Sequence, residues 1–354
     1  MEKTKINEKI KKMTDKLEKE HMLTVDEFTY ILDNVSDDDR EYIRSVAQRI
    51  AKSKFGNKVY TRGIVEFSNI CKNDCYYCGI RKSNKNFDRY RLTKEQILDC
   101  CESGYAYDYR TFVLQSGEDP YYTDEVMCDI VSAIRAKYPD CAITLSIGER
   151  SRESYQKLFD AGANRYLLRH ETANKELYEK LHPSYQKFEV RMQCLRDLKE
   201  IGYQVGTGMM IGAPFQTHMN LAEDLVFLGE FKPHMVGTGP FIPHKDTDFR
   251  NEKAGSLEMV LLCLSLVRIM LPNVLLPATT ALGSINPIGR EKGVLAGANV
   301  IMPNLSPTEV RKNYLLYDNK ICVNDASSQC KNCINARMIK IGYEVEVSRG
   351  DYKE

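Results

Sequence analysis

From residue 61 onward the chain alternates between short apolar runs and longer amphipathic segments, and this alternation constrains the fold more than any other feature. The apolar runs have the length of strands, and glycines or polar residues bound them. Eight strands are expected, at 63–67, 111–115, 142–147, 165–168, 204–209, 235–237, 274–277 and 299–302. Strands that alternate with helices build a parallel sheet. The pattern therefore predicts an α/β fold, a complete TIM-like (β/α)8 barrel.

The first 58 residues lack this alternation. They are charge-rich and have a helical pattern, with Ser36 expected as the N-cap of one helix. We therefore expect three parts, which are an N-terminal helical extension (1–58), the barrel (59–310) and a short C-terminal segment (311–354).

Charge and hydropathy argue against several classes of protein. The 50 basic and 49 acidic residues nearly balance, which argues against a nucleic-acid partner. The charged N-terminus has no signal-peptide core, and no run of 18 apolar residues predicts a membrane span. We expect a cytoplasmic protein. In that compartment the 12 cysteines indicate metal binding or catalysis, not disulfides.

Polar or glycine-rich clusters follow most of the expected strands. They include Ser68 and the segments 115–119, 146–149, 169–171 and 279–280. A single cluster of this kind would be an ordinary turn. In a barrel, however, the carboxyl ends of the strands share one rim, where active sites are built. The series therefore predicts a functional site on that rim.

Three cysteines, Cys71, Cys75 and Cys78, lie in the loop after the first expected strand. Structural zinc usually takes four protein ligands, and no fourth cysteine is adjacent. Three thiolates suit a [4Fe–4S] cluster with one open iron, which S-adenosylmethionine (SAM) can chelate through its amino and carboxylate groups. A zinc knuckle and incidental cysteines are the alternatives. The spacing, with Tyr77 as the aromatic residue, resembles the signature of the radical SAM superfamily.

Longer segments resemble the HydE family of [FeFe]-hydrogenase maturases within that superfamily. The matching blocks are 64–69, 77–79, 113–122, 165–174, 239–244, 277–281 and 297–304. The resemblance implies reductive cleavage of SAM to a 5′-deoxyadenosyl radical, which acts in assembling the two-iron subcluster of [FeFe]-hydrogenase. It further implies an iron–carbonyl–cyanide–cysteine substrate made by the maturase HydG, transfer of the product toward the scaffold protein HydF, and an external electron donor.

The resemblance also assigns residues to SAM. Glu171 and Arg191 have opposite charges that suit the zwitterionic methionine end. The full set of expected cofactor-binding residues is Gln115, Ser116, Glu171, Arg191, Met302 and Tyr77, with Glu118 as a further candidate. Taken alone, these residues would be interpreted as turn caps, a solvated arginine and a core methionine.

The resemblance further implies a second set of residues that line the barrel interior and bind the substrate. It consists of Thr144, Ser146, Arg165, Arg169, Thr279 and Thr280, with His244 as a weaker candidate. Two arginines inside a barrel require anionic partners. An anionic iron–cyanide complex or an amino-acid carboxylate would satisfy them.

A second cysteine group, Cys322, Cys330 and Cys333, lies near the C-terminus. Some HydE proteins carry such a triad, so the resemblance implies an accessory Fe–S cluster that the main reaction does not require. A structural zinc and idle reduced thiols are the alternatives.

Two other functions stay open at this point. A radical SAM enzyme similar to methylornithine synthase or biotin synthase would act on a small amino-acid-like substrate. A non-catalytic Fe–S or zinc scaffold would bind metal without cleaving SAM.

Overall fold

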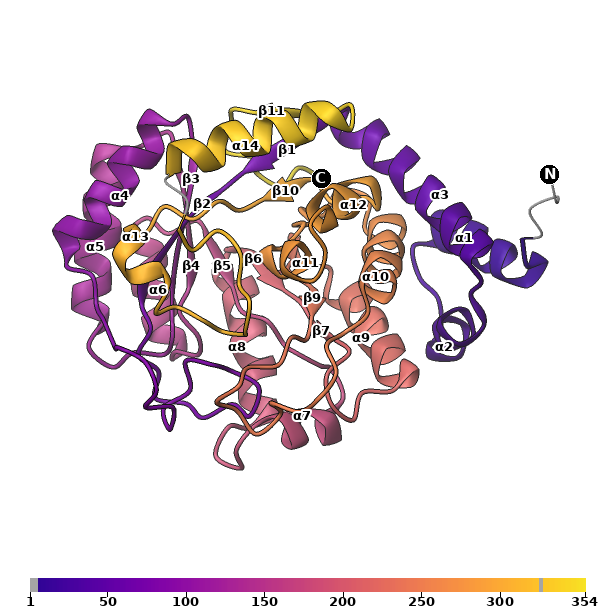
Figure 1. The fold of residues 1–354 in the computed structure, drawn as a ribbon, viewed down its shortest axis with the longest axis horizontal. Coiled ribbons are helices and arrows are strands. Elements are labelled where there is room, and N and C mark those ends of the chain that lie inside the picture. The colour runs from indigo at the N-terminus through magenta and orange to yellow at the C-terminus, as the bar shows by residue number, and fades with distance from the viewer. Residues whose placement is uncertain (1–5, 325–326) are drawn as a thin grey trace.

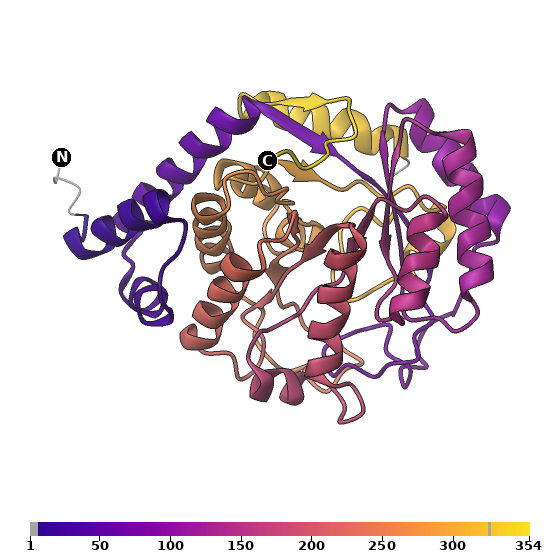
Figure 2. The same ribbon diagram turned by 180° about the vertical axis from the view of Figure 1, so that it is seen from behind.

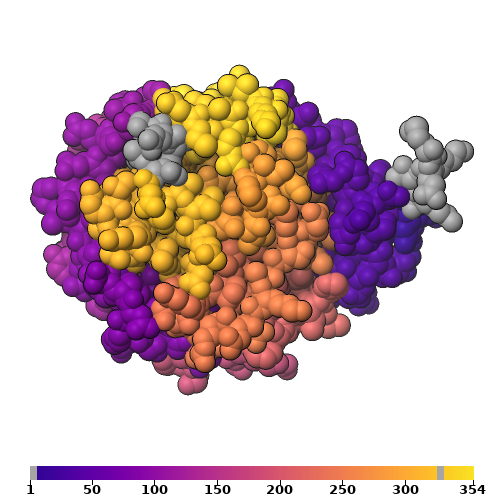
Figure 3. All heavy atoms as spheres, in the orientation of Figure 1, coloured from indigo at the N-terminus to yellow at the C-terminus, as the bar shows by residue number. Residues whose placement is uncertain are grey.

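The structure, a computed structural model, describes residues 6–324 and 327–354, without the side chains of residues 327–330. Its first three helices form an arm along one side of the body (Figures 1 and 3). These are α1 (Glu8–Glu20), α2 (Val25–Asn34) and α3 (Asp37–Phe55). Ser36 is the N-cap of α3, as predicted, and forms a capping box with Asp39. The apolar residues Ile10, Phe28 and Ile43 are fully buried and belong to the same hydrophobic core as the body.

Six parallel strands form the main sheet in chain order. They are β2 (Gly63–Ser68), β3 (Thr111–Ser116), β4 (Ala142–Ser146), β5 (Arg165–Leu167), β6 (Gln204–Thr207) and β8 (Met235–Val236). Helices in the connections cover the outer face (Figure 2). The long ones are α4 (Lys94–Ala106), α5 (Asp124–Lys137), α6 (Arg152–Asp160), α8 (Phe188–Ile201) and α9 (His218–Phe231). A parallel sheet requires such crossovers.

Strand alternation decides which side chains face inward. Val65, Leu114 and Leu145 are buried in one core with residues of the outer helices. Successive side chains of a strand point to opposite faces. The neighbours of these residues along the chain therefore point to the inside of the curved sheet, where the site lies.

The predicted complete barrel is not confirmed by the hydrogen-bonded strands. Single parallel bridges, not ladders, link the remaining segments to the main sheet and to one another. They pair Met235 with Leu275, Pro277 with Val300 and Ile64 with Asn304. The predicted strand at 274–277 contributes only such bridges, and Pro277 has no N–H to donate to a ladder.

Short strands and helices complete the fold. The strand order β10 (Val300–Ile301), β1 (Lys58–Thr61), β11 (Glu344–Glu346) makes one small sheet, and β7 (Met210–Ile211) pairs with β9 (Gly239–Pro240). The remaining helices are α7 (Lys175–Leu181), α10 (Leu257–Met270), α11 (Thr280–Ile285), α12 (Gly289–Leu295), α13 (Thr308–Arg311) and α14 (Ser327–Lys340).

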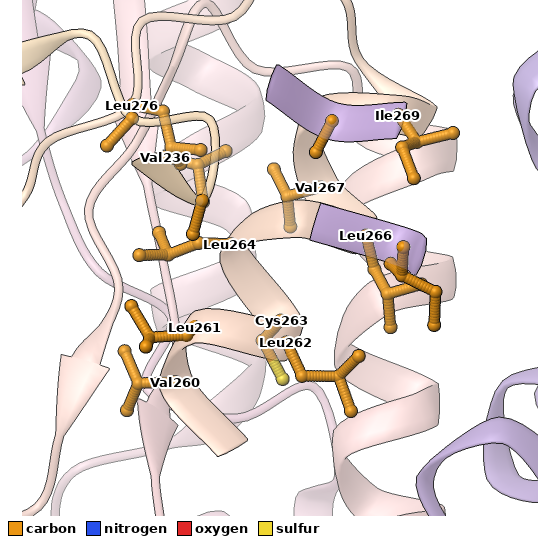
Figure 4. Close-up of a cluster of buried hydrophobic side chains, with 14 of the residues drawn as sticks. Val236, Val260, Leu261, Leu262, Cys263, Leu264, Leu266, Val267, Ile269 and Leu276 are labelled. Carbon is orange, nitrogen blue, oxygen red and sulfur yellow. The ribbon is translucent and has the colours of Figure 1, made fainter. Parts of the chain in front are cut away.

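Helix α10 is apolar on nearly all sides because it lies between the sheet and the N-terminal arm. Figure 4 shows Leu264 beside Val236 and Leu276 on the sheet side, whereas Leu266 points away from them. A helix buried all round has this composition. In the described parts of the chain, every helix falls short of the length and apolarity that a membrane crossing requires.

The C-terminal residues 349–352, here called the C-terminal plug, bind the first residues of several strands. Thr111, at the start of β3, donates its hydroxyl to the carbonyl of Arg349 over 2.9 Å. Arg165, at the start of β5, forms a 2.7 Å ion pair with Asp351. Gln204, at the start of β6, accepts the backbone N–H of Tyr352. The plug therefore covers the amino end of the sheet, opposite the predicted rim.

Candidate functional site

The carboxyl ends of the strands surround a cavity of about 350 Å³. Most sequence-predicted site residues line it. They are Cys71, Cys75, Cys78, Tyr77, Gln115, Ser116, Glu118, Ser146, Arg169, Glu171, Arg191, Thr279, Thr280 and Met302. Apolar residues such as Leu167, Met210 and Phe241 fill the rest of the wall. The site is therefore a single cavity, here called the chamber, in which thiols, charged groups and hydroxyl groups are set into an otherwise apolar wall.

The three thiols of the first cysteine group face this cavity from the loop after β2. Cys71 Sγ accepts backbone N–H groups from Asn73 and Glu118 at 3.4 Å, and Cys75 Sγ lies 3.3 Å from Gln186 Oε1. Burial, reinforced by the charge of Cys71, raises the pKa of the Cys78 thiol to about 12. A metal bound to such a thiol favours its thiolate form, which is the form that ligates.

The donor set fits an iron–sulfur cube. Within the described ranges, no three His, Cys, Asp or Glu side chains are gathered closely enough to hold a single metal ion. A [4Fe–4S] cube does not require this convergence, because each thiolate binds a different iron. Gly117 leaves the space that the loop needs, since a Cβ there would lie 2.7 Å from Cys71 Cβ.

Charged pairs form the wall beside the thiols. Arg191, on α8, is buried and binds Glu149 Oε1 at 2.6 Å and the carbonyl of Arg169 at 2.6 Å. Burial opposes its charge, but Tyr178 and Glu149 nonetheless hold the pKa of Arg191 well above its usual range. Its guanidinium is therefore a fixed positive charge at the cavity edge.

Glu171 and Glu118 each bring to the cavity wall a carboxylate oxygen, Oε2, that has no hydrogen-bond partner. Arg169 Nη2 lies 3.0 Å from Glu171 Oε2, yet the two are not aligned as a hydrogen bond, and Oε2 has no hydrogen-bond partner. The backbone φ of Glu171 is +64°, a region that a non-glycine residue adopts at a cost of order 1–3 kcal/mol. A buried carboxylate held in this way is suited to accept an ammonium group.

The other expected cofactor residues lie at the same end of the sheet. Gln115 donates to the hydroxyl of Tyr314 over 3.2 Å, and the Ser116 hydroxyl donates to the carbonyl of Gly117. The Tyr77 hydroxyl lies 3.1 Å from His182 Nε2. Burial lowers the pKa of His182 to about 3. His182 is therefore neutral at physiological pH, and its bond to Tyr77 is one between uncharged groups.

The expected substrate residues divide into two groups. Ser146, Arg169, Thr279 and Thr280 line the cavity, and the buried Thr279 hydroxyl has no hydrogen-bond partner. Thr144 and Arg165 are buried but do not line it. His244 also lies outside the lining, between Asp246 and Asp318.

The expectation for Arg165 needs correction. This arginine begins β5, whereas Arg169 follows its end, so the two lie at opposite ends of the strand. The anion that Arg165 binds is Asp351 of the C-terminal plug, a residue of the same chain. Arg165 therefore closes the amino end of the sheet and is not part of the cavity.

Two residues of the cavity wall were missed from the sequence. Lys320 and Glu66 form a 2.5 Å ion pair, and both side chains are less than a tenth exposed. Asn304 donates to the other Glu66 oxygen over 2.7 Å. These residues are far apart in the chain, so their pairing could not be predicted. Glu66 alone could have been predicted as a site residue, because it points inward on β2 directly before the polar rim.

The second cysteine group adjoins the same chamber. Cys322 and Cys333 line a neighbouring cavity of about 140 Å³, whose wall includes Lys320, Glu66 and Met302. The side chain of Cys330 lies outside the described residues. Arg290 Nη2 lies 3.6 Å from Cys322 Sγ. Two of the three expected ligands therefore share one pocket, and the Lys320–Glu66 pair lines both this pocket and the main chamber.

Comparison with known proteins agrees with this geometry. The model of the radical SAM superfamily matches residues 65–228. The chain is 48% identical over 301 residues to "[FeFe] hydrogenase maturase subunit HydE" of Thermotoga maritima, covering 85% of each protein. It is 29% identical to "3-methylornithine synthase" of Methanosarcina acetivorans, over 87% of each. The crystal structure of methylornithine synthase superposes with a TM-score of 0.82 at 27% identity, covering 94% of this chain and 97% of that one.

Radical SAM enzymes use a [4Fe–4S] cluster and SAM, and the thiol triad and charged wall of this cavity fit both. The 48% identity extends over 301 residues and far exceeds the 29% identity to methylornithine synthase. The chain belongs to the HydE family of [FeFe]-hydrogenase maturases, enzymes of the radical SAM superfamily.

Proposed function

We propose that this enzyme acts on the iron–carbonyl–cyanide–cysteine complex made by HydG, on the way to the two-iron subcluster of [FeFe]-hydrogenase. The observation that carries the proposal is the single chamber, in which three thiols face cationic and hydroxyl groups within an apolar frame. A small anionic complex would find charge partners there. The apolar wall would exclude water from a reactive intermediate.

We assign each group a task. Cys71, Cys75 and Cys78 hold the cluster, which when reduced supplies the electron that cleaves SAM to methionine and a 5′-deoxyadenosyl radical. Glu171 Oε2 accepts the SAM ammonium, and Arg191 keeps a positive charge at the methionine end. Gln115, Ser116, Tyr77 and Met302 complete the cofactor wall.

We assign the substrate to the hydroxyl groups and Arg169 of the cavity wall. The Thr279 hydroxyl is a donor without a partner, and Thr280, Ser146 and Arg169 line the same cavity. The nitrogen of a cyanide ligand or an oxygen of a carboxylate would accept hydrogen bonds from these groups. We propose that the single bridges at 275–277 and 300–304 close the sheet into a (β/α)8 barrel around this wall.

The test is anaerobic turnover of the reconstituted enzyme with SAM, reductant and the HydG product. We expect an adenosylated iron species in the electron paramagnetic resonance spectrum, which is then passed on to HydF. SAM cleavage without such a species would refute this substrate. Methylornithine synthase is a relative, so L-lysine is the matched control substrate; its rearrangement would favour an amino-acid substrate instead.

We propose that Cys322, Cys330 and Cys333 bind an accessory Fe–S cluster. Replacing all three by serine should lower the iron content and leave SAM cleavage unchanged. Loss of SAM cleavage in a folded triple variant would contradict an accessory role.

A further inference from the structure

The loop that carries the thiols has an excess of positive charge. Residues 71–91 contain six basic and two acidic residues, whereas the whole chain has 50 basic and 49 acidic residues. The loop runs along the lower edge of Figure 1, beside α7. Internal contacts of the structure occupy some of these charges, and the others lie on the surface.

Three of the basic residues serve the loop itself. Arg89 donates to four backbone carbonyls, at positions 69, 80, 81 and 84. Arg81 pairs with Asp74 and Asp248, and Arg91 pairs with Asp119. These contacts hold the loop in one conformation, so the surface it presents is preorganised.

The side chains of the three lysines of this loop lie on the surface. Lys82 and Lys85 are exposed, and neither takes part in an ion pair within the described residues. Lys72, directly after Cys71, is 55% exposed and reaches Glu118 at 3.2 Å. The backbone N–H of Lys82 donates to the carbonyl of Asn73, between Cys71 and Cys75. The unpaired positive charges of Lys82 and Lys85 therefore belong to the same loop as the thiols, and Lys82 is bonded to the turn between Cys71 and Cys75.

An exposed aromatic residue completes this surface. Tyr185 is 58% exposed, and its pKa is raised by burial and by the neighbouring charges of Asp74 and Cys75. The next residue, Gln186, contacts Cys75 Sγ. Interfaces commonly combine an aromatic anchor with a charged rim. We call Lys72, Lys82, Lys85 and Tyr185 the cluster-loop face.

We propose that the cluster-loop face is the docking surface for an acidic protein that delivers single electrons. One electron leaves the donor and reduces the cluster, with no bond or proton exchanged. Electron transfer slows steeply with distance, and this face adjoins the thiols, since Lys72 follows Cys71 and Tyr185 precedes Gln186, which contacts Cys75 Sγ. Weak redox complexes use small interfaces and rely on complementary charge for rapid association. The proposal rests on the radical SAM chemistry of the family and not on the substrate proposed above.

The test compares two charge reversals of equal size. Lys82→Glu/Lys85→Glu alters the face, and Lys12→Glu/Lys19→Glu alters exposed lysines of α1 on the far side of the molecule (Figure 1). An acidic [4Fe–4S] ferredoxin in its oxidised state is the probe, and calorimetry gives its dissociation constant. We expect the first variant to bind about tenfold more weakly and the second to bind as the wild type does. Raising the salt from 0.01 M to 0.2 M should weaken wild-type binding in the same direction.

A second readout separates docking from chemistry. With reduced ferredoxin, 5′-deoxyadenosine should form more slowly in the first variant; with dithionite, the rate should stay within about twofold of the wild type. If that variant folds poorly and loses the dithionite rate, Lys82→Gln/Lys85→Gln replaces it, with about threefold weaker binding expected. Unchanged ferredoxin binding, salt-independent binding, or equal losses in the α1 control would overturn the proposal.

Discussion

Replacing Asp351 by Asn should open the C-terminal plug. Asp351 is the carboxylate that pairs with Arg165 at 2.7 Å and with Arg349 at 2.9 Å. Its charge also offsets that of the fully buried Arg62. The substitution keeps the shape of the side chain but leaves two buried guanidinium groups without a counter-charge. Breaking a buried ion pair from one side typically costs about 3–5 kcal/mol.

The expected cost here is smaller than that. The Asp351 side chain is 32% exposed, and Arg165 keeps the Arg349 carbonyl as an acceptor. We therefore expect about 2 kcal/mol, which corresponds to about thirtyfold faster local opening. Hydrogen exchange of the amide groups of residues 346–354, followed by mass spectrometry, measures this opening directly.

The same segment supplies a control. Glu346 pairs with Lys58, and the two side chains are 32% and 44% exposed. Surface pairs contribute about 0–1 kcal/mol, so Glu346→Gln should change the exchange less than about fivefold. Equal effects of the two substitutions, or no effect of Asp351→Asn, would refute the view that this ion pair holds the plug.

The pH dependence has a definite sign. The pKa of Asp351 is lowered in the folded state; burial alone would raise it, but the hydrogen bond from Arg165 outweighs burial. A depressed carboxyl pKa stabilises the fold above the unfolded value of about 3.9, and this stabilisation is lost as the pH falls through the folded value. Protection of the plug should therefore be constant from pH 8 to pH 5, after correction for intrinsic exchange, and should decline in stronger acid.

Three further substitutions test the chamber. Cys78→Ser removes one of the three thiols, and we expect a folded protein that neither retains the cluster iron nor produces 5′-deoxyadenosine; iron analysis and chromatography measure both. Glu149→Gln removes the anion that orients Arg191, so the dissociation constant for SAM should rise about tenfold, since a neutral partner weakens the charged hydrogen bond by about 1.4 kcal/mol. Lys320→Met leaves Glu66 buried without its cation and should cost about 3 kcal/mol in thermal stability, most of which Lys320→Met/Glu66→Gln should restore.

Local patterns predicted much of the fold. The strands expected at 111–115 and 142–147 form at Thr111–Ser116 and Ala142–Ser146. Each contains an uninterrupted run of apolar and β-branched residues bounded by polar ones, which is a local signal. The segment 274–277 has a similar pattern but forms only bridges, because its pairing depends on Pro277 and on how the sheet closes.

Non-local pairings could not be predicted. Arg165 and Arg169 are both near β5, and only the three-residue length of the strand decides that they lie at opposite ends. Asp351 is 186 residues from Arg165 along the chain, and Lys320 is 254 residues from Glu66. No periodicity connects positions so far apart. The thiol triad was predictable because its ligands are neighbours in one loop.

The most direct measurement concerns the cluster at the thiol triad. We would reconstitute the protein anaerobically, reduce it with dithionite, and record its electron paramagnetic resonance spectrum before and after adding SAM. Our account predicts a reduced [4Fe–4S] signal that changes shape on SAM binding, followed by formation of 5′-deoxyadenosine. A fully reconstituted protein whose signal does not respond to SAM, and which forms no 5′-deoxyadenosine, would contradict it.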